Sequence, residues 1–444
     1  MKIPNIENAF VNIKKACDKK LTELYPMGIP ADISARYEQE LIFLKNSEHI
    51  NDFEIFRKLS EEALKCSTII SMRGTVMGSF IYYLLGNNCF NPLPVHYYCP
   101  KCGHYEVVST RLFGIDLPEK KCPNCRNSIL ADGFNLPFES VWGSNGKKLP
   151  AFEYNVSPEF LPFAGRVLSS LYPQNSIAPW GMFQMDPFTA TSYPDNRAIG
   201  VSLSGYAILP TGTTIQDYPD LISYLENGEP CLTGGSWELK DNNIRPIRLF
   251  SSDHIESLLN LQRATGIYAN EITLKELRNI TWSNIANSAV LIENTSNLFR
   301  HIKPKTYRDM ICAESASHST FSWQNTDQTD LYEYDKMISS DSFKKYPCFA
   351  REDFFDFLLE TGIERALAFD VSEQIRKGHA NSPKFRDKFN TLLIPEGIKD
   401  VAQCYSYVFP RAHCVEYVLL YARIAYYAQV DSKAFSKIMY RRKA

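Results

Sequence analysis

Two CxxC pairs separated by nineteen residues constrain this chain more than any other feature. The first pair is Cys99 and Cys102 in YYCPKCGHYE, and the second is Cys122 and Cys125 in KKCPNCRNSI. Four thiolates on two such turns suit the tetrahedral coordination of zinc. Because four cysteines complete the coordination shell and leave no position for water, the spacing predicts a structural zinc ion. Two disulfides, or a chance spacing, are the alternative interpretations.

The other cysteines favour a reducing compartment. They stand singly, at Cys17, Cys66, Cys89, Cys231, Cys312, Cys348, Cys404 and Cys414. The first residues, MKIPNIENAF, do not resemble a signal peptide, so the scattered thiols predict reduced side chains and a cytoplasmic location. No apolar run reaches the roughly 18 residues that a membrane span needs, and we therefore expect no membrane partner.

The charge balance restricts how this chain could bind nucleic acid. Its 48 basic and 50 acidic side chains give a formal net charge of −2. Such a balance provides no global positive field that would attract a polyanion. Binding to nucleic acid would therefore need a local basic groove.

Hydrophobic patterning predicts an α+β chain of two or three subdomains. Helical spacing dominates residues 5–65, and STIISMRGTVMGSFIYYLLG predicts a short strand, a glycine-containing turn and a buried helix. Strands are expected at 145–158 and in AIGVSLSGYAILP. From about residue 251 the patterning is mostly helical, most clearly in EDFFDFLLETGIERALAFDVSEQIRKG and in CVEYVLLYARIAYYAQV.

Several motifs in one order resemble a known family. NPLPVHYYCPKCGHYE, DLPEKKCPNC and LADGFNLPFESVWG surround the two CxxC pairs. Upstream stand GIPADISARYEQEL and ISMRGTVMGS, and downstream stand IRPIRLFSSDHIESLLNLQRATGI, RKGHANSPKF and FPRAHCVEYVLLYARIAYY. This series resembles the PolC-type DNA polymerase III alpha subunit, a bacterial replicative polymerase of the C family. The resemblance covers roughly residues 25–430.

The resemblance implies a fold and a division into domains. It implies a polymerase-beta-like nucleotidyltransferase palm with an inserted zinc-binding knot, followed by a mostly helical fingers domain. The implied ranges are 1–95 for an N-terminal helical and palm part, 96–126 for the zinc-binding insert, 127–250 for the rest of the palm, and 251–444 for the fingers. We expect a palm-and-fingers core only, without the exonuclease and duplex-binding modules of full-length relatives.

The catalytic motifs of the resembled family are degenerate here. That family places two aspartates in a PDIDLNF strand and a third in an HFDFHS strand, where they hold two Mg²⁺ ions. The equivalent LPAFEYNV puts Ala151 and Glu153 at the first two positions, and ungapped counting puts Ser236 at the third. Glu153 and Glu238 remain as candidate catalytic residues, with Mg²⁺ expected only if the chain is active. Under a shifted alignment, Glu159 or Asp186 would be recruited instead.

The phosphate-binding turn and the glycine-rich motif of the family also depart from its pattern. The resemblance assigns Arg73, Gly74, Gly78 and Ser79 to nucleotide binding. Met77 stands where the family has glycine, or it is a one-residue insertion, and we expect its side chain to crowd a triphosphate at the glycine position. The HPGG-like stretch of the family is reduced to VSLSGYAILP, which keeps little beyond Gly205.

The fingers region keeps its basic residues. In the resembled family this region meets the incoming nucleotide and the template, which implies that Arg376, Lys377, Arg411 and His413 contact nucleotide or DNA. Further basic residues nearby are Lys384, Arg386, Lys388 and Arg423. The alternative interpretation is a solvated helix face, balanced by neighbouring acidic side chains. His318 stands in an HST sequence that resembles a family motif, and we interpret it as a structural residue.

Three functions are compatible with these motifs. The first is a catalytically inactive polymerase core that binds DNA, nucleotide or a replication partner. The second is a minimal active DNA polymerase with rearranged metal ligands. The third is an interaction protein in which the nucleic-acid groove is filled. Activity on a primed template and salt-dependent DNA binding distinguish them.

Overall fold

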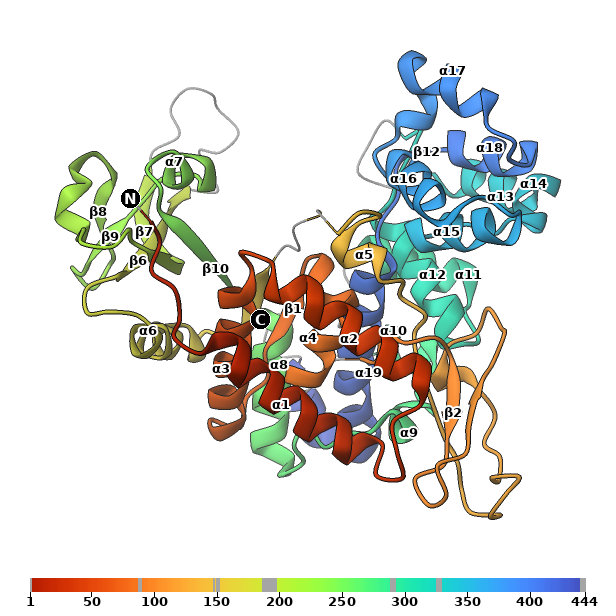
Figure 1. Ribbon diagram of the computed structural model, residues 1–444, viewed down its shortest axis with the longest axis horizontal. Coiled ribbons are helices and arrows are strands. Elements are labelled where there is room, and N and C mark those ends of the chain that lie inside the picture. Colours follow the sequence, from red (N-terminus) through yellow and green to blue (C-terminus); the bar gives the residue numbers. More distant parts are fainter. Residues whose placement is uncertain are drawn as a thin grey trace.

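The computed structural model describes residues 2–86, 90–146, 148, 152–185, 198–287, 293–324 and 330–439. It confirms the expected α+β class, because a mixed sheet is combined with many helices. Figure 1 shows a central body of helices, a small β-rich lobe on one side, and a helical lobe and a cysteine-bearing segment on the other. Ala151 and Asp186, for which the sequence predicts a lost and an alternative metal ligand, lie outside the described residues.

The largest sheet joins the central body to the β-rich lobe. Its seven strands follow the order β1-β5-β10-β7-β6-β9-β8. The strands are β1 (Ser71–Arg73), β5 (Glu153–Val156), β6 (Ile177–Met185), β7 (Ala198–Ile208), β8 (Ile222–Tyr224), β9 (Pro230–Leu232) and β10 (Arg245–Ser251). β5 runs antiparallel to β1 and parallel to β10. Segments far apart in the sequence are thereby brought side by side.

The main hydrophobic core joins the beginning and the end of the chain. The N-terminal helices, expected over residues 5–65, are α1 (Ala9–Leu24), α2 (Ala31–Lys45) and α3 (Ile50–Lys65). The other elements of this core include α4 (Phe80–Leu85), α6 (Phe160–Leu171), α8 (Asp253–Thr265), α9 (Leu274–Leu277), α10 (Trp282–Asn287), α19 (Arg411–Val430) and α20 (Ser432–Met439). α19 packs against both β1 and α8, so the last long helix completes the main core.

A second hydrophobic core forms the helical lobe, drawn in cyan and blue at the upper right of Figure 1. It is built from α11 (Glu293–Ile302), α12 (Tyr307–His318), α13 (Leu331–Ser339), α14 (Asp341–Lys345), α15 (Arg351–Glu360), α16 (Arg365–Arg376), η5 (His379–Asn381), α17 (Pro383–Thr391) and α18 (Glu396–Gln403), with the hairpin of β11 (Thr320–Phe321) and β12 (Tyr405–Tyr407). The helical second half of the chain therefore contributes to two cores, since α8 and α19 pack in the main core.

Two smaller units complete the fold. The β-rich lobe adds α7 (Ser236–Asp241), η3 (Ile215–Asp217) and η4 (Pro219–Leu221) to β6–β9, around its own small core. The cysteine-bearing segment contains a three-stranded sheet of order β3-β2-β4. Its elements are β2 (His96–Tyr98), β3 (Tyr105–Val107), η2 (Gly114–Asp116) and β4 (Leu130–Asp132), followed by α5 (Glu139–Trp142).

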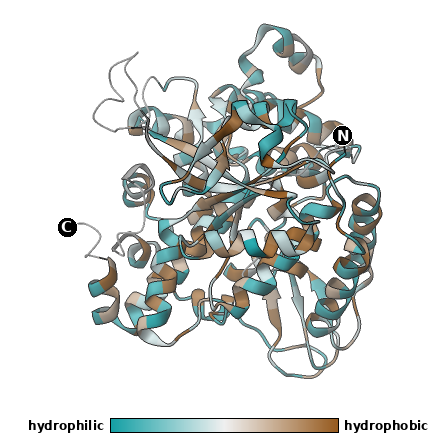
Figure 2. Ribbon diagram, turned by 90° about the vertical axis from the view of Figure 1, so that its left-hand side faces the viewer, coloured by the Kyte–Doolittle hydropathy of each residue, from teal (hydrophilic) through white to brown (hydrophobic). Residues whose placement is uncertain are grey.

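Many of the helices are amphipathic, whereas α19 is buried on most of its faces. Figure 2 shows hydrophilic and hydrophobic residues alternating along them. Within the part of the chain that the structure describes, no helix is both long enough and apolar enough to span a bilayer.

Candidate zinc centre and palm site

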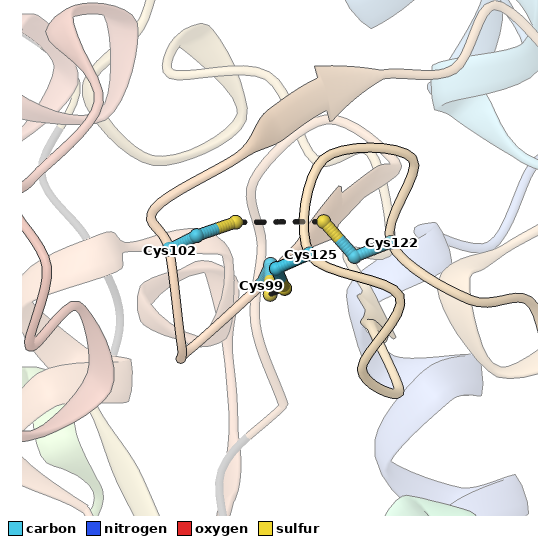
Figure 3. A group of neighbouring side chains, drawn as sticks. All are labelled: Cys99, Cys102, Cys122 and Cys125. Carbon is cyan, nitrogen blue, oxygen red and sulfur yellow. Dashed lines mark hydrogen bonds between the residues drawn. The ribbon is translucent and has the colours of Figure 1, made fainter.

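The four paired cysteines converge on one point. Their sulfur atoms all lie within 4.8 Å of one another, and Figure 3 shows that they come from two facing loops. The Sγ atoms of Cys99 and Cys125 are 3.5 Å apart, as are those of Cys102 and Cys122. Zinc–sulfur bonds of about 2.3 Å in a tetrahedron require sulfur separations of this order. The cluster can therefore hold a zinc ion.

Each CxxC pair is shaped by its own backbone. The Gly103 amide donates to the Cys99 carbonyl, and the Arg126 amide donates to the Cys122 carbonyl. Both residues after the pairs take left-handed backbone angles, with φ of 74° at Gly103 and 65° at Arg126. Glycine adopts this conformation without steric cost, which accounts for its place after the first pair.

The surrounding side chains fit a thiolate cluster. Asn127 donates from its amide to the Cys125 sulfur, and this contact lowers the pKa of Cys125 to about 6. A thiol that ionises easily is suited to metal ligation. The two nearby histidines have other partners: His96 Nδ1 lies 2.7 Å from the Pro94 carbonyl, and His104 Nε2 lies 3.7 Å from Glu106.

The cysteine-bearing segment is tied to both halves of the molecule. The Tyr98 ring packs edge-on against Tyr25, with ring centroids 4.9 Å apart. On the other side, the Asp116 carboxylate accepts hydrogen bonds from the backbone amides of Tyr307 and Arg308, at 2.6 and 3.0 Å. These two amides begin α12, so the segment caps a helix that reaches the helical lobe.

On the seven-stranded sheet, three charged side chains share one row across β1, β5 and β10. Glu153 on β5 is paired in register with Arg73 on β1 and with Arg248 on β10. Residues paired in this way project from the same face. The candidate carboxylate therefore stands between two arginines.

Arg248 contacts two of the positions that the family motifs point to. One nitrogen of its guanidinium donates to the Ser236 hydroxyl at 2.5 Å, and the other lies 3.5 Å from a Glu153 oxygen. Glu238, the remaining candidate carboxylate, accepts a 2.7 Å hydrogen bond from the Gly235 amide and so caps α7. Within the described ranges, only the cysteines form a group of three or more potential metal ligands.

The phosphate-binding turn uses its backbone within the protein. The Gly74 amide donates to Nε2 of His413 at 2.9 Å, which makes that nitrogen an acceptor and the imidazole neutral. Burial lowers the pKa of His413 to about 4, in agreement with a neutral ring at pH 7. Thus His413 at the start of α19 and the turn at Gly74 meet, although more than 300 residues separate them in the sequence.

The second half of that turn begins α4, which is capped by a buried carboxylate. Glu40 is fully buried and accepts from the Ser79 hydroxyl at 2.5 Å and from the Phe80 amide at 2.9 Å. Arg36 neutralises Glu40 and also donates to the Gly78 carbonyl. Gly78 and Ser79 are therefore engaged by side chains from α2.

The expectation that Met77 crowds a triphosphate is wrong. Its side chain is fully buried in the main core, because the turn forms a short 3₁₀ helix, η1 (Thr75–Gly78), that directs the side chain inward. A flexible apolar side chain of this kind fills irregular gaps in a core. The turn is instead occupied by His413 and Glu40.

The basic residues that the resemblance assigns to the fingers differ in their burial and in their acidic partners. Arg411 is 1% exposed and donates to Asp353 and Asp356 at 2.8 and 2.9 Å. Arg376 is half-buried beside Glu373 at 3.2 Å. Lys377 is exposed at the end of α16, and Lys384 and Arg386 are exposed on α17. These last three carry no ion pair within 4.0 Å among the described side chains.

Three residues of these sites were not singled out from the sequence: Glu40, Arg248 and Lys148. Lys148 donates to the Ser140 carbonyl at 2.9 Å, and burial together with Arg351 lowers its pKa to about 7. The available signals were the position of Lys148 a few residues before β5, and the position of Arg248 on β10, the strand beside β5. Neither residue type indicates a site by itself.

Comparison with known proteins relates the chain to bacterial DNA polymerase III alpha subunits. Residues 11–190 match the family model described as "Bacterial DNA polymerase III alpha NTPase domain". More particularly, the chain resembles the PolC-type enzymes over nearly its whole length, which confirms the resemblance drawn from the motifs.

Three relatives illustrate the extent of this likeness. Each is named DNA polymerase III PolC-type. The chain is 25% identical to that of Caldanaerobacter subterraneus over 97% of its own length, 26% identical to that of Thermotoga maritima over 96%, and 24% identical to that of Bacillus subtilis over 96%. It covers 34%, 34% and 32% of these proteins, so it spans about a third of the relatives that it matches.

The His413 contact predicts a pH dependence of stability. A histidine whose folded pKa is about 4 stays neutral in the folded chain, whereas the unfolded chain binds a proton below its pKa of about 6.5. Stability is therefore expected to fall as the pH falls between these values, by about 2 kcal/mol at pH 5 from this group. Urea unfolding at pH 7 and pH 5 should show a smaller loss in His413→Asn. Equal losses in both proteins would contradict the assignment.

Proposed function

We propose that this chain is a PolC-like polymerase core that binds nucleic acid or nucleotide but does not catalyse nucleotidyl transfer. The observation that carries this proposal is the position of the Arg248 guanidinium, between Glu153 and Ser236. A two-metal polymerase needs cations at its carboxylates, to activate the primer hydroxyl and to stabilise the leaving pyrophosphate. A fixed positive side chain repels Mg²⁺ from that place and supplies no activated oxygen.

The proposed binding function depends on positively charged side chains and needs no catalytic residues. Lys377, Lys384 and Arg386 are each exposed on the helical lobe. Phosphate contacts need positive charge and reach, not metal ligands. The proposed ligands are DNA or nucleotide, and the proposed metal is a structural zinc ion on Cys99, Cys102, Cys122 and Cys125.

Primer extension tests the lack of catalysis. Purified protein with a primed DNA template, nucleoside triphosphates and either Mg²⁺ or Mn²⁺ is expected to give no extension, with a PolC-type enzyme as the positive control. Extension that Glu153→Gln abolishes would overturn the proposal. It would support the second candidate function, a minimal polymerase, which the half-buried carboxylate of Glu153 on β5 favours.

Binding to DNA is tested separately. Fluorescence anisotropy with a labelled primed template is expected to show an affinity that falls as salt is raised, since each neutralised phosphate releases counterions. The triple variant Lys377→Ala, Lys384→Ala and Arg386→Ala should weaken that affinity by about tenfold or more. Absence of salt-dependent binding would instead favour a purely structural interaction protein.

A further inference from the structure

The row of Arg73, Glu153 and Arg248 across β1, β5 and β10 carries two positive charges and one negative charge. Arg73 is exposed, and its guanidinium lies 5.0 Å from the centre of the Phe250 ring. No acidic group lies within 4.0 Å of it among the described residues. Glu153 therefore faces two guanidinium groups with one carboxylate, at the place where the family motifs call for several carboxylates and bound cations.

Arg248 is held in place but remains accessible. Ser236 accepts from one guanidinium nitrogen, Glu153 lies beside the other, and the guanidinium lies 5.5 Å from the centre of the Trp180 ring. These contacts fix the plane of the group on three sides. Its side chain nevertheless keeps 38% of its surface exposed, so part of its donor set faces solvent.

Arg248 opens onto a groove between the sheet and the N-terminal part of the chain. The groove is lined by four basic side chains, Lys2, Lys240, Arg245 and Arg248, and by three acidic ones, Glu48, Asp52 and Glu153. Asp52 is already paired with Arg245. Lys240 is exposed and, within the described part of the chain, has no acidic partner. The charge that remains for a ligand is positive.

We propose that this palm face binds a phosphate group directly, with Arg248 and Arg73 taking the place of bridging divalent cations. A planar guanidinium matches two oxygens of a phosphate and needs no metal. Glu153 and Ser236 then act as positioning residues that orient Arg248. The inference rests on the proposed function, and it names the ligand chemistry: a phosphate from a nucleotide, from pyrophosphate or from a DNA strand, bound without Mg²⁺.

Calorimetric titration with three probes tests the inference. The probes are pyrophosphate, a deoxynucleoside triphosphate and a single-stranded oligonucleotide, each with EDTA and with Mg²⁺. We expect at least one probe to bind in EDTA and Mg²⁺ to leave that affinity unchanged or weaker, because the ion neutralises the charge that the arginines recognise. The probe that binds identifies the source of the phosphate.

Matched variants show whether Arg248 is responsible. Arg248→Ala is expected to weaken metal-free binding by about tenfold to a hundredfold, the usual loss for a charged hydrogen bond, and Arg248→Lys by less. Arg263→Ala is the control, since Arg263 is an exposed arginine that pairs with Glu159 away from this groove. Circular dichroism on each variant separates lost binding from unfolding, and Ser236→Ala offers a milder change that disturbs only the orientation of Arg248.

The outcomes separate this inference from the function on which it rests. Binding that requires Mg²⁺, binding that is unchanged in folded Arg248 variants, or no binding of any probe overturns the inference. If primer extension is still absent in that case, the proposed lack of catalysis stands. Primer extension that Glu153→Gln abolishes overturns the proposed function itself, whatever the probes show.

Discussion

Replacing Cys99 and Cys122 together by serine is expected to abolish zinc binding and to lower the free energy of unfolding by more than about 3 kcal/mol. One ligand is removed from each CxxC pair, so neither pair can complete a tetrahedral site. The loss should spread beyond the cluster, because the same segment packs on Tyr25 and caps α12 through Asp116. Metal analysis of the unaltered protein should find about one zinc per chain.

The matched control is Cys66→Ser. Cys66 is exposed and lies outside the cluster, so its replacement should change stability by less than about 0.5 kcal/mol and leave the zinc content unchanged. Urea unfolding and metal analysis on the three proteins give the comparison. A double variant that unfolds like the control would refute a structural role for the cluster. Two disulfides would show instead as metal-free protein whose thiols do not react.

Local spacing made the cysteine cluster predictable. Each CxxC pair sets its own geometry within a few residues, through the hydrogen bonds from Gly103 and Arg126 to the first cysteine of the pair. Only the meeting of the two pairs depends on the fold, and nineteen residues are few enough to allow it. The helical nature of the N-terminal region followed in the same way from spacing over single helices.

Contacts between distant segments were not predictable from such patterns. The row of Arg73, Glu153 and Arg248 depends on β5 lying parallel to β10, almost a hundred residues later in the chain. Ungapped counting predicts Ser236 at the third catalytic position, but it does not predict that Arg248 donates a hydrogen bond to Ser236. Single-sequence periodicity tells which face a strand buries, and it does not tell which strand lies beside it.

The burial of the basic residues assigned to the fingers was likewise not predictable from local sequence patterns. FPRAH predicts basic residues near a ligand, yet Arg411 is buried among acidic side chains whereas the more peripheral Lys377 is exposed. Acidic residues close in sequence to an arginine suggest a solvated surface as readily as a buried network. The burial of Arg411 depends on the start of α19 lying against α15, which no local pattern encodes.

Arg411→Met is expected to lower the free energy of unfolding by about 3–5 kcal/mol, the usual cost of breaking a buried ion pair. The substitution keeps the apolar part of the side chain and removes the charge that neutralises Asp353 and Asp356. Both partners of the closest pair, Arg411 and Asp353, are 1% exposed, so water cannot replace the lost contact. Thermal and urea unfolding of the variant measure the effect.

The dependence on pH adds a second, independent readout. Burial alone would raise the pKa of Asp353, but the guanidinium groups of Arg308 and Arg411 hold it well below its ordinary value. A carboxylate with a depressed folded pKa stabilises the protein above its unfolded pKa of about 3.9, and this contribution is lost as the pH falls further. The difference between the unaltered protein and Arg411→Met should therefore be full at pH 7 and should shrink below about pH 4.

A surface pair provides the control for the buried one. Arg263 and Glu159 lie 2.6 Å apart but are 52% and 61% exposed, so Arg263→Met should cost less than about 1 kcal/mol at any of these pH values. If Arg411 contacts nucleic acid instead of the network, Arg411→Met would unfold like this control and would lose DNA affinity while folded. That result would assign Arg411 to the binding surface. The acidic residues of the buried network would then be neutralised by Arg308 and Arg351 alone.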